Sequence, residues 1–80
     1  MIRKKEQKLV ITFHTTADAI AMEKSCKKHG ISGRLIPVPR VISAGCGLAW
    51  RAEIEDKVLL VKIMQEVGIE EEEIHECAFS

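Results

Sequence analysis

The feature that most constrains the fold of this chain is an early switch in hydrophobic periodicity. From Lys8 to Phe13 the side chains alternate between an apolar face, Leu9, Ile11 and Phe13, and a second face, Lys8, Val10 and Thr12, which is the period-two pattern of a half-buried β-strand. Thr15 and Thr16 then offer N-cap oxygens. The next segment places apolar residues at helical spacing, so the sequence predicts a helix from Thr16 to His29 that the following glycine ends.

The rest of the chain is interpreted as two strands, a helix and a final strand, and it contains no internal sequence repeat. Residues 34–38 form a short apolar run, and because Pro37 and the following Pro39 cannot donate ladder hydrogen bonds, this strand should lie at a sheet edge. A third alternating stretch covers residues 48–55, and Asp56 can cap a helix that runs through Val67. Residues 74–79 are interpreted as a fourth strand.

These elements predict an α+β fold, the ferredoxin-like βαββαβ sandwich, in which two helices cover one face of a four-stranded antiparallel sheet. Eighty residues allow one domain, so residues 1–80 are assigned to a single domain. The helices should cover an apolar set consisting of Leu9, Ile11, Phe13, Leu48 and Trp50. The opposite face should carry Thr12, Arg51 and Glu53.

The net charge and the composition argue against two classes of binding partner, nucleic acids and anionic membranes. Twelve Lys and Arg residues balance twelve Asp and Glu residues, so no global field attracts nucleic acid or an anionic membrane. RNA binding on the open sheet face is disfavoured as well, because the chain has no tyrosine and two of its three aromatic residues are assigned to the core. The N-terminal residues are charged rather than apolar, which indicates neither a signal peptide nor a membrane span and predicts a cytoplasmic protein.

Three widely spaced cysteines indicate neither a secreted disulfide framework nor a paired metal motif, and no cofactor is expected. Cys26 falls on the core face of the first helix and Cys77 in the last strand, so both are interpreted as structural. Cys46 differs, because Gly45 and Gly47 flank it and leave its sulfur without side-chain cover from sequence neighbours. We therefore expect an accessible thiol at Cys46.

The predicted topology also gives Cys46 spatial neighbours. If strands one and two are parallel with strand three between them, the Cys46 loop lies beside the turn into the first helix, which carries His14, Thr15 and Thr16. Free amides at a helix N-terminus favour a thiolate, and Arg40 and Arg51 could add positive charge. The alternatives are that Cys46 only packs the loop, that Arg40 is an exposed turn residue, and that Arg51 pairs on the open face. His14 could act as a base or metal partner, although a surface role is the more common one.

The stretch from Pro37 to Arg51, PVPRVISAGCGLAWR, resembles the selenium/sulfur carrier-like family of small bacterial domains. The resemblance rests on the PVPR segment, the Ser43-x-Gly45-Cys46-Gly47 turn, the following apolar pair and Arg51; Trp50 is bulkier than expected before that arginine. It implies that Cys46 carries sulfur or selenium as a persulfide or selenosulfide.

Two hypotheses follow from these observations. In the first, the protein is a carrier rather than an enzyme. Donor and acceptor proteins exchange the chalcogen with Cys46, and the adduct is held around Arg40, Ser43, Gly45, Gly47 and Arg51. In the second, the protein is a ferredoxin-like ligand-binding or interaction module and the cysteine is structural. The sequence leaves open whether the protein forms a homodimer through an edge strand or the sheet face.

Overall fold

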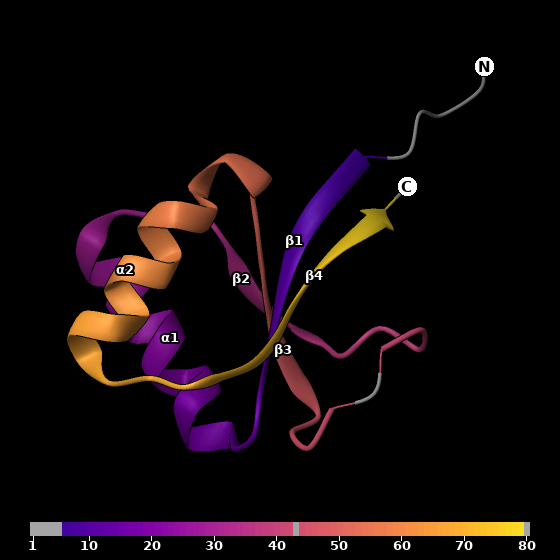
Figure 1. The fold of residues 1–80 in the computed structure, drawn as a ribbon, viewed down its shortest axis with the longest axis horizontal. Helices are drawn as coiled ribbons and strands as arrows, with labels where there is room; N and C mark the ends of the chain where they lie inside the picture. The colour runs from indigo at the N-terminus through magenta and orange to yellow at the C-terminus, as the bar shows by residue number, and fades with distance from the viewer. Residues whose placement is uncertain (1–5, 43, 80) are drawn as a thin grey trace.

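The computed structural model describes residues 6–42 and 44–79 of the chain (Figure 1). Five of its elements lie close to the predicted segments, and the sixth, the last strand, starts earlier than predicted. The elements follow the order β1 (Glu6–Phe13), α1 (Thr16–His29), β2 (Arg34–Pro37), β3 (Leu48–Ala52), α2 (Lys57–Val67) and β4 (Glu71–Phe79), with a 3₁₀ turn, Ile54–Asp56, before α2.

The strands form one four-stranded sheet in the order β2-β3-β1-β4, and the two helices form the other layer of the molecule. Strand β3 pairs antiparallel with both β1 and β2, so β1 and β2 run parallel to each other, and β4 pairs antiparallel with β1. This confirms the predicted α+β fold and the position of β3 between β1 and β2. Strand β2 is an edge strand, as its prolines indicated.

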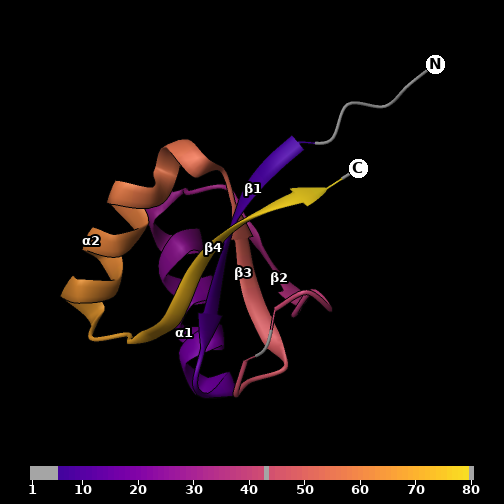
Figure 2. The same cartoon turned by 45° about the vertical axis from the view of Figure 1, so that its right-hand side comes forward.

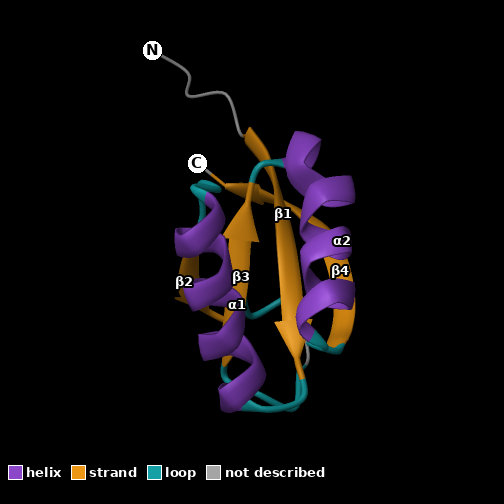
Figure 3. Ribbon diagram, turned by 90° about the vertical axis from the view of Figure 1, so that its left-hand side faces the viewer, coloured by secondary structure: helices purple, strands orange, loops and turns teal. Residues whose placement is uncertain are grey.

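Both helices lie against the same face of the sheet (Figure 3). Between the two layers is an apolar core whose largest fully buried side chain is that of Trp50. The predicted core residues Leu9, Ile11 and Phe13 have no exposed surface, whereas Leu48 is only partly buried against the core. Gly33 allows the indole to fit, because a Cβ at this position would lie 2.6 Å from the Trp50 ring, and its φ of +150° is strained for other residues.

Two strand boundaries and one helix cap differ from the sequence prediction. Strand β3 ends at Ala52 rather than continuing to residue 55, because the chain turns into the 3₁₀ segment. Asp56 occupies the N-cap position of α2, but with ψ near 1° its side chain makes no capping hydrogen bond. Strand β4 begins at Glu71 rather than Ile74, so the acidic segment is part of the sheet; pairing with β1 overrides the low strand propensity of glutamate there.

The face opposite the helices is less open than its polar residues suggested. Arg51 and Glu53 lie there as predicted, but Thr12 is fully buried, as are its apolar neighbours Val10 and Ala49. The Thr12 hydroxyl donates to the carbonyl oxygen of Glu73 at 3.3 Å and accepts from the Glu73 amide at 3.1 Å. These bonds satisfy the buried hydroxyl next to the irregularity in the β1–β4 register. Strand β4 lies beside β1 along the edge of the sheet (Figure 2).

Candidate functional site

The loop that joins β2 to β3 carries Cys46 back to the end of β1. At the neck of the loop, the amide of Val38 donates to the carbonyl oxygen of Gly47 at 3.0 Å. The amide of Cys46 donates to the carbonyl oxygen of Phe13, the last residue of β1, at 3.2 Å. The loop therefore lies beside the turn from β1 into α1, where the predicted topology placed it.

Among the residues that the structure describes, two polar groups lie within hydrogen-bond distance of the Cys46 sulfur. The hydroxyl of Thr16, the first residue of α1, lies 3.6 Å from Sγ, and the amide of Leu48 donates to Sγ at 3.4 Å. Thr15 fixes this helix start, because its hydroxyl accepts from the Asp18 amide at 3.2 Å in the N-cap arrangement that the sequence predicted. The sulfur thus accepts one hydrogen bond from a backbone amide, and the Thr16 hydroxyl beside it can donate to the sulfur or accept from it.

The expectation of an accessible thiol at Cys46 is wrong for this conformation. Only 5% of the residue is exposed, and it belongs to the same buried cluster as Phe13 and Trp50. The flanking glycines are themselves exposed. The sulfur is covered instead by residues distant in the sequence. The backbone hydrogen bonds from Val38 to Gly47 and from Cys46 to Phe13 turn the side chain toward the start of α1.

Glu72 is a component of the site that the sequence interpretation missed. Its carboxylate accepts from the Gly45 amide at 3.2 and 3.3 Å, and Oε1 lies 3.6 Å from His14 Nδ1. Glu72 thus joins the loop to the first residues of β4 and to the turn after β1. The available signal was topological: β4 runs antiparallel to β1, so its first residues must lie where β1 ends. Starting the fourth strand at Ile74 concealed this contact.

The other predicted site residues are distributed unevenly around the sulfur. Thr15, Thr16 and His14 are at the site, although His14 contacts Glu72 rather than the thiol. Arg40 is exposed in the turn that begins at Pro39, and within residues 6–42 and 44–79 it is not among the hydrogen-bond partners of Sγ. Ser43 lies outside the described residues.

Arg51 does not belong to the Cys46 site. It lies roughly 10 Å further along β3 than Leu48 at a rise of about 3.3 Å per residue, and it pairs with Val10 and Arg34. Its guanidinium carbon lies 4.4 Å from the centre of the Phe79 ring. The positive charge that the sequence suggested for the thiol is therefore at the other end of the strand.

The two remaining cysteines have surroundings that suppress reactivity. Cys26 is fully buried on the core face of α1, as predicted, and desolvation raises the pKa of its thiol to about 11, with a smaller contribution from Asp56. Burial also raises the pKa of Cys77, which is half-buried in β4. Within the described part of the chain, no three His, Cys, Asp or Glu side chains are placed to hold a metal ion.

The fold and this loop define a class of small α+β domain that presents one cysteine beside a helix N-terminus at the end of its sheet. The chain belongs to the family described as putative Se/S carrier protein-like, whose family model matches residues 8–76. No curated protein and no solved structure matches the chain. None of the helices in the described residues is long and apolar enough to span a membrane.

Proposed function

We propose that this protein is a cytoplasmic carrier that holds a sulfur or selenium atom on Cys46 and passes it from a donor protein to an acceptor protein. The observation that carries the proposal is the placement of one sulfur against the Thr16 hydroxyl and the Leu48 amide at the start of α1. Membership of a family named for carriage agrees with this role and with a protein that does not itself turn over substrate.

Transfer to Cys46 follows the pattern of thiol–disulfide exchange. The Cys46 thiolate attacks the outer sulfur of a donor persulfide, a new S–S bond forms on Cys46, and the donor's S–S bond breaks to release the donor thiolate. Cys46 is oxidised to the persulfide as the donor persulfide is reduced to a thiol, so no further oxidant is needed. Delivery to the acceptor is the same exchange in the opposite direction. A selenosulfide would be carried in the same way.

Because the sulfur is buried, the loop would control access to it. Because Cys46 is buried, its sulfur must be uncovered before it can attack a donor or be attacked by an acceptor, and the hydrogen bonds at the neck and to Glu72 hold the loop closed over it. In the covered state the adduct would be shielded from cellular thiols. The exposed segment around Arg40 would meet the partner protein first, since Arg40 and Val41 lie at the surface of this loop.

Loading of the purified protein with a low-molecular-weight persulfide tests the proposal. Mass spectrometry of the intact protein and of its peptides should show one added sulfur atom on Cys46 in the wild type and none in Cys46→Ser. Cys77→Ser is the matched control, because it removes a different thiol and should load normally. Loading that persists in folded Cys46→Ser would reject Cys46 as the carrier residue.

A second candidate function is supported by the burial of Cys46 within the core cluster. In this case the domain is a ligand-binding or interaction module and the thiol only packs the loop. Cys46→Ala would then retain binding to whatever partner the wild type captures, whereas the carrier loses the transferred atom in the same variant. Partner capture with the wild type and Cys46→Ala, followed by persulfide detection, separates the two functions.

A further inference from the structure

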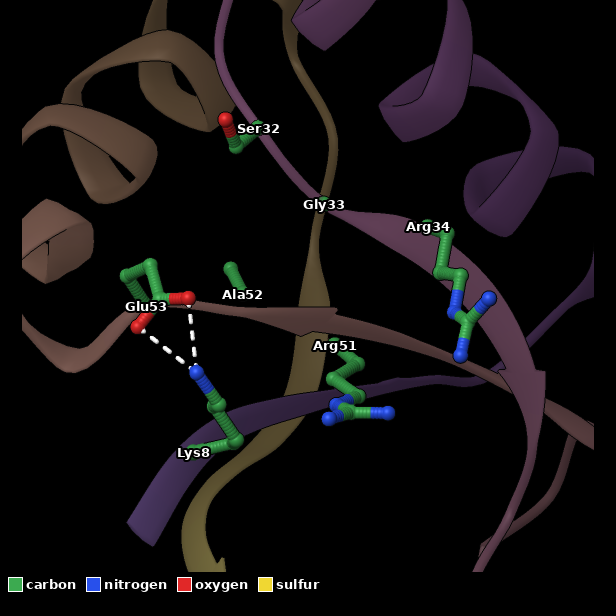
Figure 4. A pocket seen from close by; sticks show the side chains of 7 residues that line it. All are labelled: Lys8, Ser32, Gly33, Arg34, Arg51, Ala52 and Glu53. Atoms are coloured by element: carbon green, nitrogen blue, oxygen red, sulfur yellow. Dashed lines mark hydrogen bonds and ion pairs between the residues drawn. The ribbon is translucent and has the colours of Figure 1, made fainter. Parts of the chain in front are cut away.

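A shallow pocket of about 250 Å³ lies away from Cys46, where β3 ends and β2 begins (Figure 4). Cationic side chains dominate its wall, together with one carboxylate and one hydroxyl. The lining residues are Lys8, Ser32, Gly33, Arg34, Arg51, Ala52 and Glu53. The volume is below the roughly 300–1,000 Å³ of pockets for drug-sized ligands, so a small polar ligand fits its size.

Arg34 and Arg51 oppose each other across the β2–β3 ladder as direct partners in the register. Directly opposed residues share one face of a sheet, so both guanidinium groups project from the same surface, and like charges in this position destabilise a sheet. Among the residues that the structure describes, neither arginine forms an ion pair with a carboxylate. The fold thus places two positive charges together without compensating them.

The carboxylate in the pocket already has a partner. Glu53 accepts from Lys8 Nζ at 2.7 and 2.9 Å, and this bonding raises the pKa of Lys8. Glu53 therefore offsets the charge of Lys8 and leaves the arginines available. Arg51 is further held in place by the Phe79 ring, with 4.4 Å between the guanidinium carbon and the ring centre.

We propose that Arg34 and Arg51 form a binding site for a phosphate group, either free phosphate or the phosphate of a small monoester. Planar guanidinium groups donate two parallel hydrogen bonds to the oxygens of a phosphate, and two such groups match the charge of a dianion. The Ser32 hydroxyl lines the same pocket and supplies a further donor. The site is separate from the Cys46 loop and does not depend on thiol chemistry.

Amide chemical shifts measured by NMR at constant ionic strength test the site, with chloride replaced stepwise by inorganic phosphate, glycerol phosphate or acetate. We expect saturable shifts confined to residues 32–34 and 51–53 with the two phosphates, and weaker binding of acetate because it carries one charge. Arg34→Gln and Arg51→Gln should each weaken phosphate binding about tenfold or more. Arg34→Gln should raise the melting temperature without phosphate, because it removes the like charge opposite Arg51 and leaves the contact between Arg51 and Phe79 in place.

Lys62→Gln is the matched control, because it removes one positive charge from an exposed position of α2 that does not line the pocket. It should bind phosphate like the wild type. The proposal is overturned if phosphate causes no saturable shift, if Lys62→Gln weakens binding as much as Arg34→Gln, or if acetate binds as tightly as phosphate. Glycerol phosphate binding more tightly than inorganic phosphate would identify a monoester as the ligand, and the reverse would identify free phosphate.

Discussion

Replacing Glu72 with alanine should make Cys46 react faster with an alkylating reagent while the protein remains folded. Glu72 is the residue through which β4 holds the cysteine loop, by way of the Gly45 amide at 3.2 and 3.3 Å. Cys46 as a residue is only 5% exposed, so a reagent reaches its thiol chiefly when the loop opens. Removing the carboxylate lowers the free energy of that opening.

The size of the effect follows from this hydrogen bond. A bond to a charged group contributes about 1.5–3 kcal/mol. Gly45 is exposed and the Glu72 side chain keeps 22% of its surface in solvent, so the lower end of that range applies. About 1.4 kcal/mol corresponds to a tenfold change in an equilibrium constant. The alkylation rate of Cys46 should therefore rise about tenfold in Glu72→Ala.

Pulsed alkylation with iodoacetamide at neutral pH, read by peptide mass spectrometry, reports all three thiols in one experiment. Cys26 and Cys77 are internal standards, and their rates should not change. Glu72→Gln retains an acceptor oxygen without the charge and should give a smaller increase than alanine. Glu73→Ala removes a carboxylate from the neighbouring, exposed position and should leave the Cys46 rate close to that of the wild type.

An unchanged rate in Glu72→Ala would refute the reasoning, since the thiol would then react without release of the Gly45 contact. A similar increase in Glu73→Ala would show that the loss of negative charge, rather than the opening of the loop, controls the rate. A parallel increase at Cys26 would indicate global destabilisation, because Cys26 is fully buried in the core.

Three further predictions concern stability. Gly33→Ala should lower the free energy of unfolding by about 2 kcal/mol in urea denaturation, because the new Cβ meets the Trp50 ring at 2.6 Å and φ is +150°; unchanged stability would show that the indole moves freely. Thr15→Ala should cost about 1 kcal/mol through loss of the N-cap bond to Asp18, whereas Thr15→Ser should retain most of it. Burial raises the pKa of the Cys26 thiol from 9.0 to about 11. The thiol therefore ionises at lower pH in the unfolded protein than in the folded one. Its contribution to the free energy of unfolding is fully present below pH 9 and is lost as the pH rises to 11. Between these pH values the free energy of unfolding, measured by urea denaturation, should fall by about 2 kcal/mol more in the wild type than in Cys26→Ala. The same pH dependence in both proteins would contradict the assignment.

Much of the secondary structure is encoded locally and was predictable. The alternation in residues 8–13, the Thr15 cap and the left-handed Gly30 that ends α1 each depend on neighbours within a few positions. The start of β4 was not predictable in this way, because four glutamates in a row at 70–73 have low strand propensity. The inclusion of Glu71, Glu72 and Glu73 in the sheet depends on pairing with β1, which is distant in the sequence.

The candidate site likewise has one part that could be predicted from the sequence and another that could not. Cys46 and its position beside Thr16 could be inferred from the motif and from the order of elements, since topology alone brings the loop to the start of α1. The position of Arg51 away from the thiol follows from the length of β3, and its pairing with Arg34 follows from the strand register. Neither register nor side-chain direction is specified by the residues around Cys46.

The sequence by itself determined the order of strands and helices, the α+β class and the one cysteine loop at the end of the sheet. These depend on periodicity, caps and glycines, which act over a few residues. Only the tertiary structure decided that the Cys46 sulfur is covered, that Glu72 holds its loop and that Arg34 and Arg51 share a pocket. Each of these results from contacts between segments far apart in the chain, where packing and strand register determine which side chains meet.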